Sequence, residues 1–352
     1  MTHGVRLAFD SGKTHRTHGT VMPSITVLRR AATCLATALT LSLVAGPAGA
    51  ADKVTFLTSW FAQAEHGGFY QAKATGLYEK QGLDVTIKMG GPQVNGMQLL
   101  LGGETDMMIG YDFQVLNGVS KGLPVITVGT SFQKDLQGIM THADVKDLGD
   151  LKDRTILIAA SGRTSWWPFV KAKFGYSESQ LQPYTFNLQP FFADDKIAQQ
   201  SYPSSEPYQA LQKGVPVNFY LFADYGYSPY GTTIVTTTKF LTEHPDVVGR
   251  FVKASMEGWK SYLKGDPAPA NKLIQADNPN MSDGQIAFGI KRLNELQIVD
   301  GGDAKTMGIG IMTEARWKQT YDFMVASDLL PKDTDWHKAF TTQFVKDLKI
   351  MW

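Results

Sequence analysis

Strand-like and helix-like patterns alternate along most of this chain, and the alternation restricts the folds open to it. Runs rich in β-branched and aromatic residues are separated by segments with apolar residues at helical spacing. The first strand-like runs are 54–58, 82–87, 107–110 and 125–128. A strand, a helix and a strand joined by short links form right-handed parallel units. The sequence therefore predicts an α/β fold.

A second series of the same kind begins near residue 155 and ends in a strand-like run at 232–237. Beyond about residue 245 the pattern is mostly helical, and later helices are predicted at about 282–296 and 313–327. A chain of 352 residues exceeds what one hydrophobic core usually organises. Two lobes are therefore expected.

The simplest arrangement inserts the second series into the first. We predict that lobe one comprises residues 52–135 plus 235–352 and that lobe two comprises residues 140–230. The two crossing segments would form a hinge. Ligands of open α/β sheets bind beyond the carboxyl ends of the strands, so loops of both lobes would face one cleft.

Residues 1–50 have the features of a leader. Met22 is the expected start, Arg29 and Arg30 supply positive charge, and the apolar stretch 31–44 is too short for a membrane anchor. The small residues at 48–50 suit cleavage after Ala50. We therefore expect export to the periplasm.

The charge and the cysteine content exclude several classes of site. Without the leader the chain has 29 basic and 32 acidic residues, and it lacks the basic stripe expected of a nucleic-acid-binding protein. The single cysteine, Cys34, lies within the leader, so the exported chain has no thiol for a disulfide or a metal. His142, His244 and His337 are not at metal-ligand spacing. Neither a metal nor a cofactor is expected.

Several short motifs together point to a known family. They are Trp60, the run 66–70 (HGGFY), the pattern across 72–85, the Leu-x-x-Gly-x-x-Asp pattern of 100–106, and the run 205–208 (SEPY). These residues resemble the nitrate, sulfonate and thiamine-precursor branch of periplasmic binding proteins, and the resemblance covers nearly all of 53–345.

That resemblance implies a type II periplasmic binding protein fold: two α/β lobes and a two-segment hinge. It also implies an ABC permease and, through it, an ATPase as partners. The aromatic, histidine and tyrosine opening is similar to that of proteins that bind the aminopyrimidine precursor of thiamine. Eukaryotic relatives that synthesise this pyrimidine use a cysteine-rich iron motif, and the lack of cysteine beyond the leader argues against that enzymatic role here.

Three candidate ligand residues lie near the first strand-to-helix corner. Trp60 and Tyr70 could stack on a flat ring, although large aromatic residues near a helix start are also common in cores. His66 precedes two glycines, so we expect its side chain over a turn with open backbone, where it could donate a hydrogen bond. A structural histidine is the alternative.

The segment 161–165 follows a strand and precedes a helix expected near Trp166. Ser161 and Thr164 could bind a polar ring edge or an anion, and Arg163 could clamp a carboxylate, sulfonate or phosphate. Simple capping of the helix by these hydroxyls is equally compatible with the pattern. Trp166 could add an aromatic wall, or could belong to a buried helix face.

Four further candidates complete the predicted site. Glu206 precedes Pro207, which we expect to hold it in a loop, where its carboxylate could accept two hydrogen bonds from an aminopyrimidine. A helix-start acid is the alternative. Tyr111, Asp112 and Asp224 follow strands and could line the hinge side of the cleft, or simply cap turns.

These features predict a monomeric, non-enzymatic binding protein that reaches the membrane only through its permease. The expected ligand is a small flat heterocycle such as the thiamine pyrimidine precursor. Binding of an alkanesulfonate, nitrate or riboflavin is the alternative, and pyrimidine synthesis is a more distant one. The sequence contains no nucleophile elbow, phosphate-binding loop or metal motif that would support an enzyme.

Overall fold

The structure is a computed structural model that describes residues 50–352. The predicted leader, its start at Met22 and the Cys34 position lie outside the described residues. Within residues 50–352 no helix combines the length and the apolar character that a membrane crossing requires.

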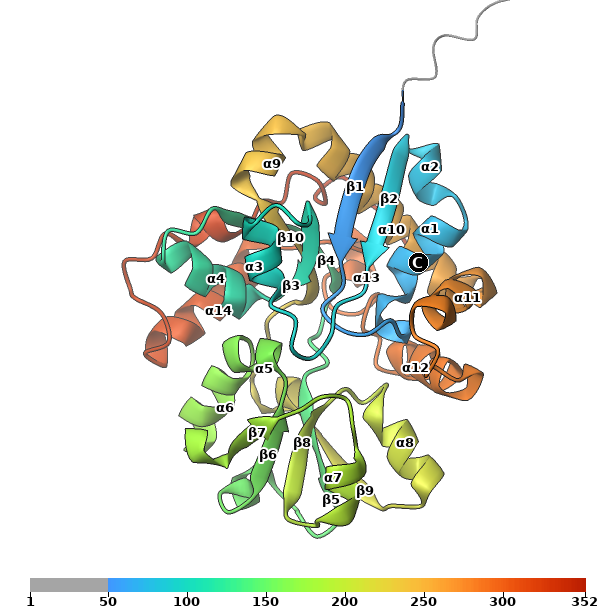
Figure 1. The fold of residues 1–352 in the computed structure, drawn as a ribbon. Coiled ribbons are helices and arrows are strands. Elements are labelled where there is room, and N and C mark those ends of the chain that lie inside the picture. Colours follow the sequence, from blue (N-terminus) through green and yellow to red (C-terminus); the bar gives the residue numbers. More distant parts are fainter. Residues whose placement is uncertain (1–49) are drawn as a thin grey trace, which may run out of the picture. The chain divides into compact units, whose positions relative to one another are not determined.

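The first sheet has five strands in the order β2-β1-β3-β10-β4 (Figure 1). Strand β1 pairs in parallel with β2 and β3, whereas β10 runs antiparallel to both β3 and β4. The strands are β1 (Asp52–Leu57), β2 (Leu83–Lys88), β3 (Met107–Gly110), β4 (Val125–Phe132) and β10 (Gly231–Thr237).

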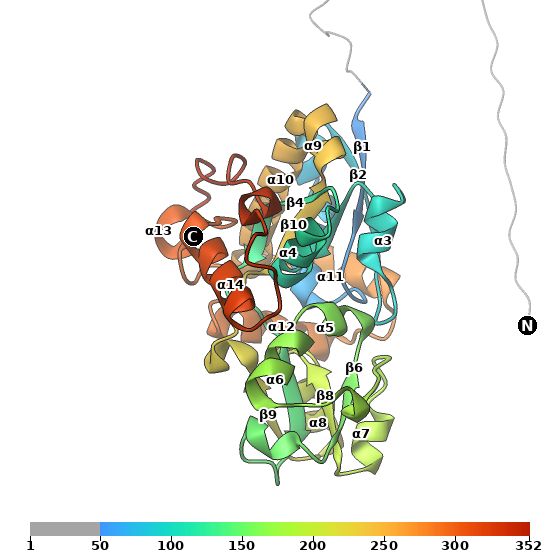
Figure 2. The same cartoon turned by 90° about the vertical axis from the view of Figure 1, so that its left-hand side faces the viewer.

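The second sheet repeats this plan in the order β7-β6-β8-β5-β9. Strand β6 is parallel to β7 and β8, and β5 is antiparallel to β8 and β9. The strands are β5 (Gly138–His142), β6 (Thr155–Ile158), β7 (Leu181–Pro183), β8 (Ile197–Ser201) and β9 (Val217–Leu221). Figure 2 shows the two sheets one above the other, each covered by helices. We call the parts built on them lobe one and lobe two.

Helices surround both sheets. Those of lobe one are η1 (Ala64–His66), α1 (Gly67–Ala74), α2 (Leu77–Lys80), α3 (Gly96–Leu101), α4 (Asp112–Ser120), α9 (Thr238–Glu243), α10 (Pro245–Lys264), α11 (Ala268–Asp277), α12 (Asp283–Glu295), α13 (Ala304–Met307), α14 (Glu314–Ala326) and η5 (Trp336–Ala339). Those of lobe two are η2 (Leu148–Leu151), α5 (Ala160–Thr164), α6 (Trp167–Phe174), η3 (Glu178–Gln180), α7 (Gln189–Ala193), α8 (Glu206–Lys213) and η4 (Phe222–Tyr225). The predicted helices near 282–296 and 313–327 are thus confirmed as α12 and α14.

The chain passes between the lobes twice, from β4 to β5 and from β9 to β10. At the first crossing the Gln133 side chain donates to the Ile311 carbonyl at 2.8 Å, and at the second the Tyr230 amide donates to Asp112 Oδ2 at 2.9 Å. Both crossings are therefore tied to lobe one. Their action as a hinge, and the lobe boundaries that we predicted, remain proposals.

The glycine pair after His66 has a packing role that the sequence analysis missed. Gly67 and Gly68 open α1 and press against α10. A Cβ atom would lie 2.0 Å from the Tyr262 ring at Gly67 and 2.2 Å from the Trp259 ring at Gly68. The expectation of an open turn here was wrong, because the glycines allow two helices to approach closely.

Candidate ligand-binding site

A cavity lies where the two lobes meet, with about 430 Å³ of empty volume including its open mouth. We call it the inner cavity. Its lining includes five of the eleven residues that the sequence singled out: Trp60, His66, Tyr111, Ser161 and Glu206. The other lining residues are Ser59, Gln63, Glu65, Gln137, Gln200, Ser201, Tyr202 and Thr232. Most of the lining is therefore polar, as in a site that recognises hydrogen-bonding groups.

Glu206 is held on the lobe-two side of the inner cavity. Its carboxylate accepts hydrogen bonds from the Tyr184 hydroxyl at 2.9 Å, the Ser201 hydroxyl at 3.1 Å and the Tyr202 amide at 3.0 Å. The side chain is buried, and burial raises the pKa of the carboxyl despite these bonds. A buried carboxyl with three fixed donors is a preorganised acceptor.

The predicted loop at Glu206 was wrong, since Glu206 is the first residue of α8. Pro207 does not exclude it from the helix, because a proline in the first turn lacks only an amide hydrogen that would have no helical partner. The positive end of the helix dipole also favours an acid at this position.

Glu65 supplies a second carboxyl from lobe one, and sequence reasoning missed it. It lies in η1 and accepts a hydrogen bond from the Ser204 hydroxyl of lobe two. Burial raises the pKa of Glu65 to about 7, and the nearby Glu206 contributes in the same direction. The one available signal was its place directly before His66 in the family motif. The inner cavity therefore brings together two carboxyls from different lobes.

His66 adds a neutral ring to the inner cavity. Burial lowers the pKa of its imidazole to about 3, so the ring is uncharged at physiological pH. Its Nδ1 atom is buried and has no hydrogen-bond partner within residues 50–352. A buried polar atom of this kind is available to a ligand.

Trp60 lines the inner cavity and is packed against two further aromatic side chains. Trp60 of lobe one stacks on Tyr184 of lobe two with ring centroids 5.8 Å apart and planes 27° apart. Phe186 meets the Trp60 ring edge-on at 6.0 Å. Because Tyr184 also holds Glu206, the aromatic contact and the carboxylate belong to one connected structure.

Two tyrosine hydroxyls meet across the lobes on another side. Tyr111 lies directly after β3 and Tyr202 directly after β8, with 3.4 Å between their hydroxyl oxygens. The Gln137 side chain, which belongs to a crossing segment, donates to the Tyr202 hydroxyl at 3.3 Å. These three residues join both lobes and a crossing segment at the inner cavity.

The lining has an unbalanced charge. It contains two glutamates and neither lysine nor arginine. Within residues 50–352, moreover, no group of three or more His, Cys, Asp and Glu side chains is placed to hold a metal ion. An inner cavity of this composition favours a neutral or cationic partner that donates hydrogen bonds, and disfavours an anion.

A family model described as NMT1/THI5 like matches residues 63–270, more than half of the chain. The chain belongs to the NMT1/THI5-like family. This assignment agrees with the resemblance seen in the sequence motifs.

Individual relatives and solved structures add detail. The riboflavin-binding protein RibY of Chloroflexus aurantiacus is 27% identical, covering 84% of this chain and 86% of that protein. The formylaminopyrimidine-binding protein of Halalkalibacterium halodurans is 23% identical over 64% of this chain and 71% of its own. The solved alkanesulfonate-binding protein SsuA of Xanthomonas axonopodis has a TM-score of 0.56 at 16% identity, covering 82% of this chain and 98% of that one. The last likeness shows that this family member has the periplasmic binding protein fold, as predicted.

One enzyme also matches part of the chain. The 4-amino-5-hydroxymethyl-2-methylpyrimidine phosphate synthase of Schizosaccharomyces pombe is 27% identical over 36% of this chain and 38% of that protein. This match is confined to little more than a third of either protein.

Three of the predicted site residues are buried in the lobes instead of lining the inner cavity. Tyr70 packs in lobe one, and its hydroxyl donates to Asp277 at 2.6 Å. Asp112 begins α4, and its carboxylate accepts the Tyr230 amide of the second crossing. Trp166 is fully buried against Phe222, with ring centroids 4.9 Å apart. For Tyr70 and Trp166 the packing alternative describes what the structure shows, whereas Asp112 binds a backbone amide of a distant segment instead of capping a local turn.

Arg163, Thr164 and Asp224 lie outside the inner cavity. Arg163 is exposed and its guanidinium is 3.8 Å from Glu178 Oε2. The Thr164 hydroxyl donates to the Ser161 carbonyl at 3.2 Å. Residues 160–164 themselves form the short helix α5, and these hydroxyls do not cap the next helix, so the capping alternative was wrong. Asp224 is exposed beside the second crossing, 3.9 Å from the Lys134 amine.

Proposed function

We propose that this protein is the substrate-binding subunit of an ABC importer. It acts in the periplasm, captures a small flat heterocycle such as the thiamine pyrimidine precursor between its lobes, and delivers it to the permease without chemical change. The observation that carries the ligand class is the inner cavity itself: two buried carboxyls, a neutral imidazole and an aromatic wall, without a basic side chain in the lining.

An aminopyrimidine suits this lining. Its exocyclic amine and a protonated ring nitrogen can both donate to the Glu206 carboxylate, and charge-assisted bonds of this kind are stronger than neutral ones. The neutral His66 ring and the Gln200 amide offer further partners at the edge of a ring. Trp60 supplies an aromatic face for stacking, worth about 0.5–1.5 kcal/mol beyond simple burial.

An alkanesulfonate or nitrate fits the inner cavity poorly. An anion beside Glu65 and Glu206 would keep both carboxyls protonated and would find no cation in the lining. Riboflavin is the second candidate, because it is flat and uncharged and because the riboflavin-binding relative matches most of the chain. The aminopyrimidine and riboflavin are both ring compounds without negative charge.

Lobe closure is the proposed mechanism of capture. Polar contacts join the lobes in this structure: Ser204 donates to Glu65, the Gln93 side chain donates to the Tyr184 carbonyl at 3.2 Å, and the Ala160 amide donates to the Pro92 carbonyl at 2.9 Å. A ligand that touches both lobes binds the closed form better and so shifts the population toward it. The permease would then recognise the closed form.

A thermal-shift screen tests the ligand class. The full chain would be purified, freed of bound ligand by unfolding and refolding, and tested with 4-amino-5-hydroxymethyl-2-methylpyrimidine, thiamine, riboflavin, taurine and nitrate. A ligand at 100 times its Kd adds about 2.7 kcal/mol to the free energy of unfolding, which gives a clear rise in Tm. We expect rises with the uncharged or cationic rings. A rise with taurine or nitrate alone would contradict the proposal.

A further inference from the structure

A second hollow lies along the boundary between the lobes and shares one lining residue with the inner cavity. We call it the outer groove; its empty volume is about 1030 Å³. Lobe one lines it with Asn95, Met97, Gln114, Asn117, Gly118, Lys121 and Leu123, and lobe two with Ala160, Ser161, Arg163, Thr164 and Pro168. Ser161 lines both spaces, so the inner cavity and the outer groove adjoin at this residue.

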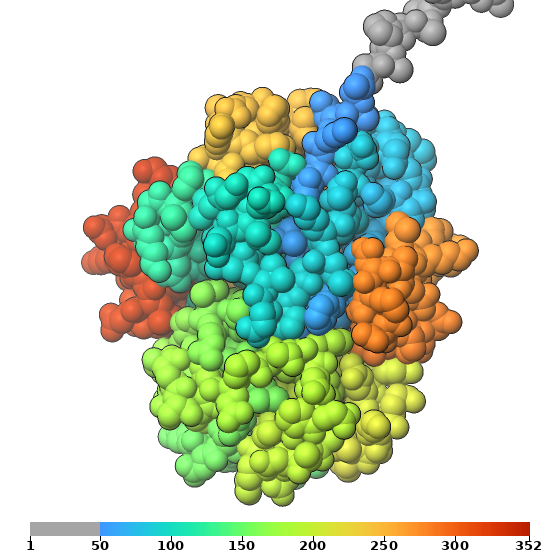
Figure 3. Space-filling model, in the orientation of Figure 1, coloured from blue at the N-terminus to red at the C-terminus, as the bar shows by residue number. Residues whose placement is uncertain are grey.

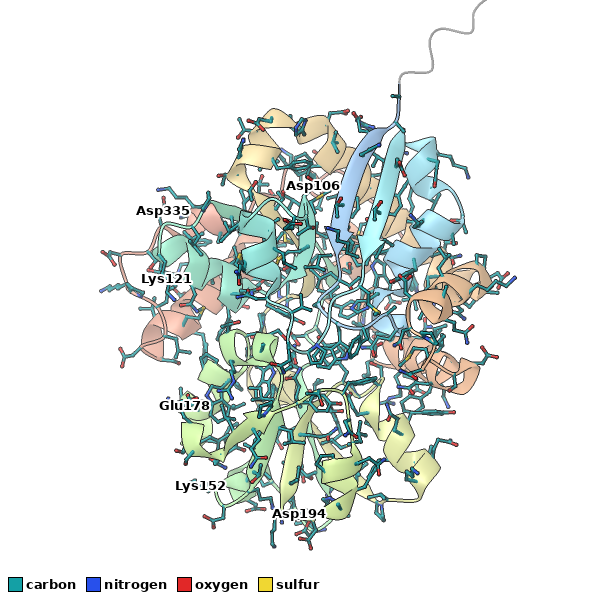
Figure 4. All side chains as sticks on the ribbon, in the orientation of Figure 1. Asp106, Lys121, Lys152, Glu178, Asp194 and Asp335 are labelled. Atoms are coloured by element: carbon teal, nitrogen blue, oxygen red, sulfur yellow. The ribbon has the colours of Figure 1, made fainter. Side chains whose placement is uncertain are left out.

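The outer groove lies on the side of the molecule that carries α4 and α6. The space-filling view shows the two lobes meeting along a seam below the α3 and α4 region (Figure 3). Figure 4 places the labelled Lys121 on lobe one and Glu178 on lobe two on this same side, whereas Lys152 and Asp194 lie toward the far end of lobe two.

The two spaces differ in chemistry. The inner cavity has two carboxyls, whereas the outer groove has none; its polar lining consists of carboxamides, hydroxyls and two cations, interspersed with apolar residues. The Asn117 amide nitrogen donates to the Phe113 carbonyl at 3.0 Å, which fixes the amide group and leaves its oxygen as an acceptor. Asn95 is fixed in the opposite sense, because its oxygen accepts the Gln98 amide at 3.2 Å and its nitrogen remains a donor.

Fixed amide donors and acceptors suit hydroxyl groups on a ligand, because a hydroxyl both donates and accepts hydrogen bonds.

The two cations of the outer groove provide weaker support for a phosphate on the ligand. Arg163 already lies beside Glu178, which also receives hydrogen bonds from Lys171 at 3.0 Å and Trp167 at 2.7 Å. Lys121 is the remaining cation of the lining, and it is exposed at the end of α4.

We propose that the ligand is a ring that carries a tail of several hydroxyl groups, with the ring in the inner cavity and the tail in the outer groove. The inference rests on the proposed function, because it assumes that the ring is held in the inner cavity. The tail passes Ser161, where the two spaces adjoin, and meets Asn117 and Gln114 of α4 together with Thr164 of α5.

Three flavin probes separate the ring from the tail. Lumichrome has the ring without a tail, riboflavin adds a chain of hydroxyls, and flavin mononucleotide adds a phosphate to that chain. Each would be titrated calorimetrically into the full chain freed of ligand, beside 4-amino-5-hydroxymethyl-2-methylpyrimidine. Because two or three net hydrogen bonds add about tenfold or more in affinity, riboflavin should bind at least about tenfold more tightly than lumichrome. The phosphate should bring no further gain.

Substitutions in the outer groove should affect the tail only. Asn117→Ala and Gln114→Ala should each weaken riboflavin about three- to tenfold and leave lumichrome unchanged, since each removes one tail partner. Lys152→Ala, on the exposed surface of lobe two, is the matched control and should change neither. The Tm of each ligand-free variant checks that it folds.

The possible failures are distinguishable. Two results would contradict the hydroxyl tail while leaving the proposed function intact. One is equal affinity for lumichrome and riboflavin, and the other is binding of the pyrimidine without binding of either flavin. A tenfold advantage of flavin mononucleotide that Arg163→Ala abolishes would replace the hydroxyl tail by a phosphate and so overturn the inference. No binding by any ring would remove both proposals.

Discussion

The two lobes place a tyrosine and an acid at the same point of the same topology, yet they use the acid differently. In each sheet the third strand in the order, β3 or β8, is followed by a tyrosine and then by a helix that begins with an acid. Those acids are Asp112 of α4 and Glu206 of α8. Asp112 binds the backbone of a crossing segment, whereas Glu206 lines the inner cavity.

The length of the connection accounts for the difference. Tyr111 alone separates β3 from α4, and Asp112 is buried against the second crossing. Residues 202–205 separate β8 from α8, and this longer connection brings the start of the helix to the boundary between the lobes. One scaffold therefore provides either a structural carboxylate or a ligand-facing one, and the length of a loop decides which.

Lobe one does present a carboxyl to the inner cavity, but from another connection. Glu65 follows β1 and has a pKa raised to about 7 by burial. The folded protein therefore holds a proton on Glu65 over the range from about 4.5 to 7, where the unfolded chain does not. Binding of that proton stabilises the folded protein. Its contribution to the free energy of unfolding is fully present below about pH 4.5 and is lost as the pH rises through 7.

The largest expected effect tests this difference between the lobes. Glu65→Gln should reduce the fall in the free energy of unfolding between pH 5 and pH 8 by about 2.5 kcal/mol, because most of the titration between the ordinary pKa of 4.5 and the folded pKa of about 7 lies in that range. Urea denaturation of both proteins at the two pH values measures it. Glu79→Gln, which changes an exposed glutamate of α2, is the control. If the free energy of unfolding falls equally in the variant and in the unmodified protein between pH 5 and pH 8, Glu65 does not carry the proton.

The next effect tests the two helix-start acids directly. Glu206→Gln and Asp112→Asn make the same chemical change at the same topological position. Glu206→Gln should weaken binding of the aminopyrimidine about ten- to a hundredfold, because a hydrogen bond to a charged group contributes about 1.5–3 kcal/mol. Asp112→Asn should leave the affinity within about twofold, since its oxygen can still accept the Tyr230 amide. Titration calorimetry measures both, and an equal loss in the two variants would end the distinction between the acids.

The strand and helix alternation could be predicted from the sequence because it depends on local periodicity. The apolar stripe of α10 illustrates this: Val248, Phe251, Val252 and Trp259 recur at helical spacing in the sequence and are all buried in the structure. Strand β8 was not predicted, since its Gln199, Gln200 and Ser201 are polar and are buried only because the strand is central. Gln200, Ser201 and Tyr202 of the inner cavity were missed together with that strand.

Candidate site residues could be chosen by residue type and by their position after a strand. The direction in which each side chain points could not be predicted. Trp60 follows β1 and lines the inner cavity, whereas Tyr70 lies one helix later and turns toward α11. Glu65 was missed because, apart from its place directly before His66, nothing local distinguishes it from a surface glutamate. Its position depends on Ser204, which is 139 residues away in the sequence.

The smallest expected effect concerns the paired tyrosines, where the two lobes are most alike. Tyr111 and Tyr202 occupy equivalent positions, and their hydroxyl oxygens are 3.4 Å apart, longer than the usual 2.7–2.8 Å for such a bond. A double-mutant cycle with Tyr111→Phe and Tyr202→Phe should therefore give a coupling of only about 0.5 kcal/mol in urea denaturation of the ligand-free protein.

Repeating the cycle with bound ligand sharpens the comparison. If ligand draws the lobes together, the hydroxyls approach and the coupling measured from ligand affinities should rise toward about 1 kcal/mol. Tyr321→Phe, which removes a hydroxyl that donates to Lys332 far from the inner cavity, should show no coupling to either tyrosine. A coupling near zero with and without ligand would mean that the matched tyrosines pack beside each other without joining the lobes. The equivalence of the two positions would then reflect shared topology alone.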